Sequence, residues 1–278
     1  MGTPKPTELA RTETKGDVPS SAKGFFTDTT LCIGCKACEV ACKQWNQLPE
    51  DGLTFTGRSY DNTGALGPST WRHVAFVERT NDDGQLSWLM MSDVCKHCTR
   101  AGCLEACPTG AILRTEHGSV YIQPDVCNGC GYCVASCPFG VVDRLDQDGR
   151  AFKCTLCYDR LQGDLEPACA KACPTDSILF GDVGELRARA EARVNELKAH
   201  GVAGARLYGA DAESQPGTEG LNAFFLLVDE PEVYNLPPDP VAPAKKAKAS
   251  WAAMAVAAVA VGAAAVLSVR STRHGVFR

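Results

Sequence analysis

The sequence predicts an α+β protein of short strands, cysteine-rich loops and one long surface helix, followed by a single C-terminal transmembrane helix. Three observations support this prediction. Sixteen cysteines among 278 residues recur at short fixed intervals, short apolar segments alternate with turn-forming residues, and a long uncharged segment lies near the C-terminus. The formal net charge of −5 argues against a nucleic-acid-binding protein.

Seven short strands are predicted, and four of them form two hairpins. Each hairpin is indicated by a turn-forming sequence, NDDG at 81–84 and EHGS at 116–119, between two apolar or alternating segments. Residues 1–23 are polar, so we expect a disordered arm without an export signal of its own. The strands are expected at residues 24–27, 71–79, 85–91, 111–114, 120–123, 177–180 and 223–228.

One long helix is predicted at residues 185–200, which are rich in alanine, glutamate, arginine and leucine. Its repeating apolar positions are Leu186, Ala190, Val194 and Leu197. Gly201 follows as a stop signal. This single apolar stripe predicts a helix that lies on the protein surface and packs by one face.

The C-terminal region reads as a linker and a membrane anchor. Residues 231–243 are proline-rich and predict an extended linker. Residues 251–269 contain no charge, and as a helix they would span about 28 Å, close to the ~30 Å hydrocarbon core of a bilayer. Lysines precede this segment and arginines follow it, as expected for a membrane span, but their balance does not favour one orientation.

The cysteines form four groups of four, with none left over. In the spacing C-x2-C-x2-C-x3-C, typical of bacterial ferredoxins, the first three cysteines bind one 4Fe–4S cluster and the fourth binds the neighbouring cluster. A proline follows the last cysteine of the second, third and fourth groups. The groups are Cys32, Cys35, Cys38 and Cys42; Cys95, Cys98, Cys103 and Cys107; Cys127, Cys130, Cys133 and Cys137; and Cys154, Cys157, Cys169 and Cys173.

Four 4Fe–4S clusters explain this pattern better than disulfides or zinc. Cysteines two residues apart in a tight loop are poorly placed to bridge one another, and no signal directs the chain to an oxidising compartment. Zinc also binds C-x2-C pairs, but the repeated x3-Cys-Pro ending is not typical of zinc sites. A zinc-stabilised scaffold remains the competing hypothesis from a different class of protein.

The order of the groups suggests two ferredoxin-like units that each hold two clusters, one unit inserted in the other. The outer unit comprises residues 24–94 and 145–240, the inserted unit comprises residues 95–144, and residues 241–278 form the linker, transmembrane helix and tail. Pairing the third group with the fourth is an open alternative. The nested arrangement predicts set I (Cys32, Cys35, Cys38, Cys173), set II (Cys42, Cys154, Cys157, Cys169), set III (Cys95, Cys98, Cys103, Cys137) and set IV (Cys107, Cys127, Cys130, Cys133).

The residues around the motifs indicate a conductor of electrons rather than a catalytic centre. We identify no phosphate-binding loop and no nucleophile–base motif. His97 is expected to be a loop histidine and not a ligand, because its group has all four cysteines. Cations near a cluster would raise its reduction potential, but we expect most of those beside the motifs to be ordinary solvated charges. They are Lys36, Lys43, Lys96, Arg100, Lys153 and Lys171.

These motifs resemble the iron–sulfur (beta) subunits of molybdopterin oxidoreductases, and most closely the beta subunits of membrane-bound formate dehydrogenases. The order of the groups, with x4 in the second and x11 in the fourth, carries the family resemblance. The closer resemblance to formate dehydrogenase comes from residues 59–76, from the helix predicted at residues 185–200 and from the C-terminal membrane span. The segments are Cys32–Asn46, Ser59–Phe76, Cys127–Val141 and Lys153–Gly181. One departure is the missing proline after Cys42.

The resemblance implies a function and a set of partners. A catalytic alpha subunit with a molybdenum or tungsten pterin cofactor would oxidise formate, and this chain would pass the electrons through four clusters to a membrane cytochrome b subunit or to quinone. The resemblance also favours the nested ligand sets. It further implies a single-pass protein whose folded part is extracytoplasmic and is exported by means of the signal sequence of its catalytic partner. The alternative is the same role beside an uptake hydrogenase or another molybdopterin oxidoreductase.

Overall fold

The structure is a computed structural model, and it describes most of the chain. The described residues are 19, 21–52, 54–58, 60–80, 84 and 86–275. They divide into two units, one ending at Ala242 and one beginning at Pro243. Each unit is described by itself below.

Most of the predicted N-terminal arm lies outside the described residues, as does the predicted turn at 81–83. The end of the arm belongs to the folded unit instead. Ala22 is buried against the apolar core, and Lys23 begins the first strand. The prediction of disorder is therefore wrong for these two residues, because the apolar contacts of the sheet begin before the predicted strand.

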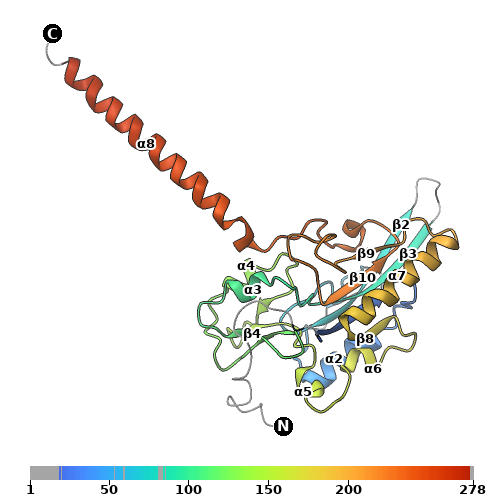
Figure 1. Ribbon diagram of the computed structural model, residues 1–278. Helices are drawn as coiled ribbons and strands as arrows, with labels where there is room; N and C mark the ends of the chain where they lie inside the picture. Colours follow the sequence, from blue (N-terminus) through green and yellow to red (C-terminus); the bar gives the residue numbers. More distant parts are fainter. Residues whose placement is uncertain are drawn as a thin grey trace. The chain divides into compact units, whose positions relative to one another are not determined.

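A four-stranded sheet forms the centre of the larger unit (Figure 1). Its strand order is β8 (Ile178–Asp182), β1 (Lys23–Asp28), β10 (Ala223–Leu227) and β9 (Arg206–Tyr208). β1 pairs antiparallel with β8 and parallel with β10. β10 is a continuous AFFLL segment that is buried at every position, which is typical of a central strand covered on both faces.

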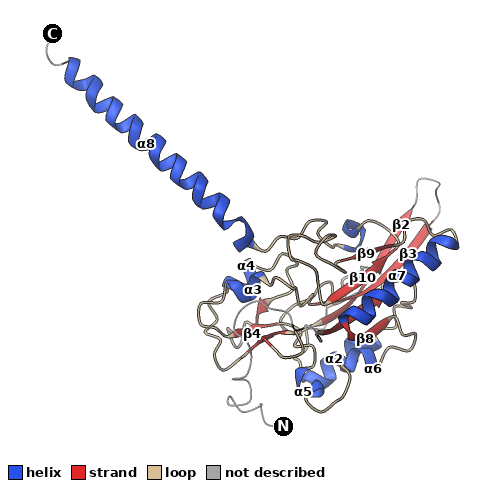
Figure 2. Ribbon diagram, in the orientation of Figure 1, coloured by secondary structure: helices blue, strands red, loops and turns tan. Residues whose placement is uncertain are grey.

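Helix α7 (Val183–Ala199) packs against β1, β8 and β9 (Figure 2). Asp182 caps its first turn, where its carboxylate accepts hydrogen bonds from the backbone N–H groups of Gly184 and Glu185. The predicted stripe faces the core, with Leu186, Ala190 and Val194 buried. The helix prediction is confirmed, and its start is two residues earlier than expected.

The two predicted hairpins are confirmed, and a third was not predicted. The long hairpin joins β2 (Arg72–Thr80) and β3 (Leu86–Val94), and a shorter one joins β4 (Ile112–Arg114) and β5 (Val120–Ile122). The additional pair, β6 (Asp143–Arg144) and β7 (Ala151–Phe152), has only two residues per strand. Strands this short carry no periodic pattern that a sequence could show.

Short helices follow the cysteine loops. The longest of them is α2, of ten residues, and the others have four residues each. They are α2 (Ala37–Asn46), α3 (Gly102–Glu105), α4 (Tyr132–Ala135), α5 (Tyr158–Leu161) and α6 (Ala168–Lys171).

The proline-rich segment after β10 is not the extended linker that its composition predicts. It begins with the 3-10 helix η1 (Pro231–Tyr234) and runs along the larger unit. Tyr234, Leu236 and Ala242 are buried. The tyrosine and leucine pack into the same apolar core as β10. Apolar side chains between the prolines therefore attach this segment to the core, which composition alone does not reveal.

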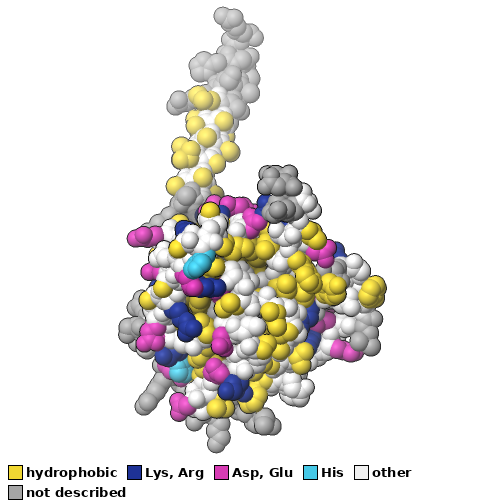
Figure 3. All heavy atoms as spheres, turned by 90° about the vertical axis from the view of Figure 1, so that its right-hand side faces the viewer, with side chains coloured by type: hydrophobic (Ala, Val, Ile, Leu, Met, Phe, Trp, Pro, Cys, Tyr) yellow, Lys and Arg dark blue, Asp and Glu magenta, His cyan; other side chains and the backbone are white. Residues whose placement is uncertain are grey.

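The second unit is helical. A short turn, η2 (Pro243–Lys246), leads into α8 (Ala247–Gly275). Within the described part of the chain, α8 contains the one segment long and apolar enough to cross a membrane, Ser250–Leu267. Its side chains are exposed and largely hydrophobic, as Figure 3 shows.

The centre of the sheet allows a direct test of the fold. Gly24→Ala is expected to destabilise the protein, and Gly181→Ala is not. The two glycines face each other across β1 and β8. A Cβ atom at Gly24 would lie 1.8 Å from the backbone oxygen of Asn222, whereas one at Gly181 would meet only the Leu186 side chain at 3.9 Å.

Overpacking a core typically costs ~1–3 kcal/mol, and at Gly24 the backbone itself must move, so we expect the upper end of that range. Thermal melting of the cluster-loaded protein measures the effect. Equal melting temperatures for the two variants would contradict the observed strand register.

Candidate metal centres

Each cysteine group ends on a short helix that presents two cysteines four residues apart. On α2 these are Cys38 and Cys42; on α6 they are Cys169 and, just beyond its end, Cys173. Residues i and i+4 of a helix lie on the same face, roughly 6 Å apart along the axis. Such a pair can therefore serve two neighbouring clusters. α2 packs against α6, and α3 against α4.

Four thiols line one small cavity in the outer part of the unit. They are Cys32, Cys35, Cys38 and Cys173. The loop reaches this arrangement through left-handed backbone conformations at Gly34 and Lys36, with φ of 66° and 59°. Ser92 also lines the cavity, and its hydroxyl lies 3.2 Å from the sulfur of Cys38.

A second cavity is lined by another four thiols. They are Cys95, Cys98, Cys103 and Cys137. His97 and Lys96 line the same space, and both are buried. His97 lies on the loop, as predicted, with a φ of 44°. The backbone N–H of Val120 donates to its Nδ1 at 3.1 Å, so its Nε2 carries the proton.

The remaining eight thiols line neither of these two cavities. For two of them, Cys42 and Cys133, the neighbouring thiols are apparent from the charges that shift the pKa. Burial raises the pKa of Cys42, and the neighbouring thiols of Cys154, Cys169 and Cys157 raise it further. In the other group, burial raises the pKa of Cys133 to about 11, with further contributions from the thiols of Cys127, Cys107 and Cys130. The structure thus brings four thiols together at each of two cavities, and it places further thiols near Cys42 and near Cys133.

The four groups of thiols differ in access to solvent. Cys35 and Cys130 are exposed, and each belongs to a different group. The groups that contain Cys42 and Cys95 have no exposed thiol; their members are buried or half-buried. Two groups therefore lie at the surface and two lie inside.

Three buried cations lie beside these thiols without a carboxylate partner in the described part of the chain. They are Arg72, Arg114 and Lys153, which are between 1% and 4% exposed. Arg72 donates to the sulfur of Cys169 at 3.3 Å. Arg114 and Lys153 donate to backbone carbonyl groups, among them those of Cys98 and Cys154.

The prediction of solvated cations is therefore wrong for Lys96 and Lys153, which are buried. Lys96 differs from Lys153 in that it forms an ion pair with Asp93. Arg72 and Arg114 lie outside the cysteine motifs and were not predicted at all. The strand pattern could have indicated that Arg72 is buried, because residues two apart in a strand share a face and Val74 is buried.

The donors around the thiols fit an anionic iron–sulfur cluster. Among the described residues, Arg72 Nε, Arg114 Nε and His97 Nε2 are buried N–H groups without a hydrogen-bond partner. A buried donor without an acceptor is costly. The sulfides and thiolates of a cluster are acceptors, and such hydrogen bonds also tune its potential. The donor set of four sulfurs is the one that 4Fe–4S clusters require.

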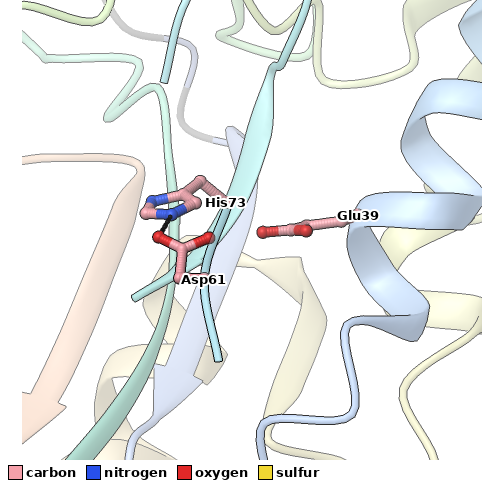
Figure 4. Close-up of side chains that lie close together, drawn as sticks. All are labelled: Glu39, Asp61 and His73. Atoms are coloured by element: carbon pink, nitrogen blue, oxygen red, sulfur yellow. Dashed lines mark hydrogen bonds and ion pairs between the residues drawn. The ribbon is translucent and has the colours of Figure 1, made fainter. Parts of the chain in front are cut away.

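A separate polar cluster anchors the first cysteine loop (Figure 4). Asp61 contacts His73 at 2.7 Å, and Glu39 lies close to both. The ammonium group of Lys36 lies 2.8 Å from Asp61 and 3.1 Å from Glu39. Because a cation of the chain already occupies this position, the cluster serves as a clamp between α2, β2 and the intervening loop.

Comparison with known proteins also indicates iron–sulfur clusters. Two family descriptions, each of a 4Fe–4S dicluster domain, match residues 86–183 and residues 31–111. The chain is thus an iron–sulfur protein with dicluster domains.

Individual relatives are more specific. The iron–sulfur subunit of formate dehydrogenase from Haemophilus influenzae is 44% identical over 217 residues, covering 77% of this chain and 68% of that protein. The formate dehydrogenase-O iron–sulfur subunit of Escherichia coli K12 is 40% identical over 243 residues, covering 84% and 79%. Formate dehydrogenase subunit beta of Megalodesulfovibrio gigas is 32% identical over 220 residues, covering 77% and 97%. The chain belongs to the family of formate dehydrogenase iron–sulfur subunits.

Proposed function

We propose that this chain transfers electrons within a formate dehydrogenase through four 4Fe–4S clusters, with sets I to IV as their ligands. One observation carries the proposal: two cavities are each lined by four thiols, those of sets I and III. The thiols that act on Cys42 and on Cys133 are those that sets II and IV assign to them, which supports the other two sets. Each cluster supplies a one-electron carrier. The chain's own residues contribute the thiolates, the surrounding N–H donors and the exclusion of water.

The clusters follow one another in the order I, II, III, IV. Sets I and II share the helices α2 and α6, and sets III and IV share α3 and α4. The step between sets II and III is supported by the pKa of Cys154. Burial raises this pKa most, and the nearby thiol of Cys95, in set III, raises it further. The exposed thiols, Cys35 and Cys130, belong to the two ends of this chain of clusters.

The same contacts support the proposed division of the larger unit. In it, residues 95–144 form an inserted dicluster unit within an outer one made of residues 24–94 and 145–240. The packing of α2 against α6 joins the two parts of the outer unit across the insertion. The pairing of β1 with β8 joins them a second time.

The partners follow from this role. A separate catalytic subunit oxidises formate on a molybdenum or tungsten pterin cofactor and delivers electrons to one exposed end. A membrane cytochrome b subunit or quinone receives them at the other end. The exposed apolar segment Ser250–Leu267 anchors the chain in the membrane. The folded unit lies on the extracytoplasmic side.

Purification of the detergent-solubilised complex tests the proposal. We expect about sixteen iron and sixteen labile sulfide per chain, together with a pterin-containing large subunit and formate-dependent dye reduction. A nickel-containing large subunit would instead assign the chain to an uptake hydrogenase. A colourless protein with zinc and without labile sulfide would contradict the clusters themselves.

A further inference from the structure

Arg72 occupies the boundary between sets I and II. It is 1% exposed and lies at the start of β2. Its Nη2 donates to the sulfur of Cys169, a set II thiol, at 3.3 Å. Its Nη1 donates to the hydroxyl of Ser92 at 3.3 Å, and that hydroxyl lies 3.2 Å from the sulfur of Cys38 in set I. One guanidinium group thus reaches a thiol of each set.

The charge of Arg72 is directed at sulfur and not at a carboxylate. In the described part of the chain it forms no ion pair with aspartate or glutamate, whereas Lys96 pairs with Asp93. The ring of Phe25 lies 4.7 Å from the guanidinium carbon and excludes water on that side.

A fixed positive charge in this place has a predictable redox effect. Each cluster gains one negative charge when it is reduced, and a nearby cation stabilises the more negative state. The low dielectric of a buried site strengthens this attraction. Arginine keeps its charge at all accessible pH values, so the effect does not depend on protonation.

We propose that the positive charge of Arg72 raises the reduction potentials of two adjacent clusters, those of sets I and II. Ser92 connects Arg72 to set I. The proposal rests on the proposed four-cluster electron-transfer chain. It assigns the two clusters a shared electrostatic control that the cysteine ligands alone do not provide.

Redox titration of the purified complex, followed by low-temperature EPR, tests the proposal. Arg72→Gln is expected to lower the reduction equilibrium constants of clusters I and II by roughly tenfold or more, where tenfold is about 59 mV for a one-electron couple. Cluster IV, at the far end of the proposed order, is the internal reference and should not shift. Arg72→Lys retains the charge and should restore most of the potential.

Two further variants keep the test decisive. Arg206→Gln removes the same formal charge from an exposed arginine that pairs with Glu230, and it should shift no cluster. If Arg72→Gln fails to load its clusters, Ser92→Ala is measured in its place. We then expect a smaller downward shift confined to cluster I.

Unchanged potentials in a fully loaded Arg72→Gln complex would overturn the role of Arg72. An unchanged potential of cluster I in Ser92→Ala would overturn the extension of that role to set I. Either result would leave the electron-transfer function intact. Fewer than four clusters in the unsubstituted complex would instead overturn the proposed chain of clusters.

Discussion

Cys42→Ser is expected to remove the cluster of set II and to leave the cluster of set I in place. Cys42 follows Cys32, Cys35 and Cys38 in one motif, but the fourth cysteine of this motif typically binds the neighbouring cluster. On α2, Cys42 lies one turn beyond Cys38. After burial, the thiols of Cys154, Cys169 and Cys157 are the next causes that raise its pKa, which places it near them. Because Cys42 is only 5% exposed, water is poorly placed to supply a replacement ligand.

The measurement is the iron content together with low-temperature EPR of the reduced complex. The expected result is a loss of about one quarter of the iron and of one signal, with electron transfer from formate to the membrane acceptor falling to near background. Cys35→Ser is the matched control, since it alters an exposed ligand of set I. Loss of the same signal in both variants would refute the nested ligand sets.

Removal of the clusters is expected to unfold the larger unit. Burial raises the pKa of Cys38 to about 11 and that of Cys103 to about 12, so without iron these thiols stay neutral near pH 7. Arg72, Arg114 and Lys153 would then remain buried without anionic partners. Leaving one buried charge uncompensated costs about 3–5 kcal/mol.

Three such charges would together cost about 9–15 kcal/mol, which is comparable to the stability of an ordinary domain, about 5–15 kcal/mol. Binding and folding are therefore coupled, as in other small metal-binding folds. Anaerobic chelation followed by near-UV circular dichroism and limited proteolysis measures the effect. We expect loss of the near-UV signal and rapid cleavage between residues 24 and 240. A cluster-free protein that kept its near-UV signal would contradict the coupling.

The candidate site could be proposed largely from the sequence because the cysteine spacing is local information. The three-residue spacing before each last cysteine is a helical spacing, and it directs one thiol towards each of two clusters. The hairpins were also predictable, since alternation and turn residues mark them over short distances. Helix α7 carried both its apolar stripe and its stop signal in the sequence.

What could not be predicted depends on pairings between distant residues. The parallel register of β1 with β10 joins Phe25 to Ala223, and no local pattern encodes it. Arg72 meets Cys169 through the same kind of long-range packing. The segment from η1 to Ala242 was misjudged because proline content indicates stiffness but does not show whether neighbouring apolar side chains find a core.

In the proposed ligand sets, the last cysteine of each group binds the cluster of its partner group. This arrangement affects the order in which the clusters can be inserted. With the proposed ligand sets, sets III and IV are complete once Cys137 has been synthesised. Set I, although it opens the chain, must wait for Cys173 on the far side of the insertion. A nascent chain can therefore fill its inserted unit first, and the clusters of sets I and II are the last to be installed.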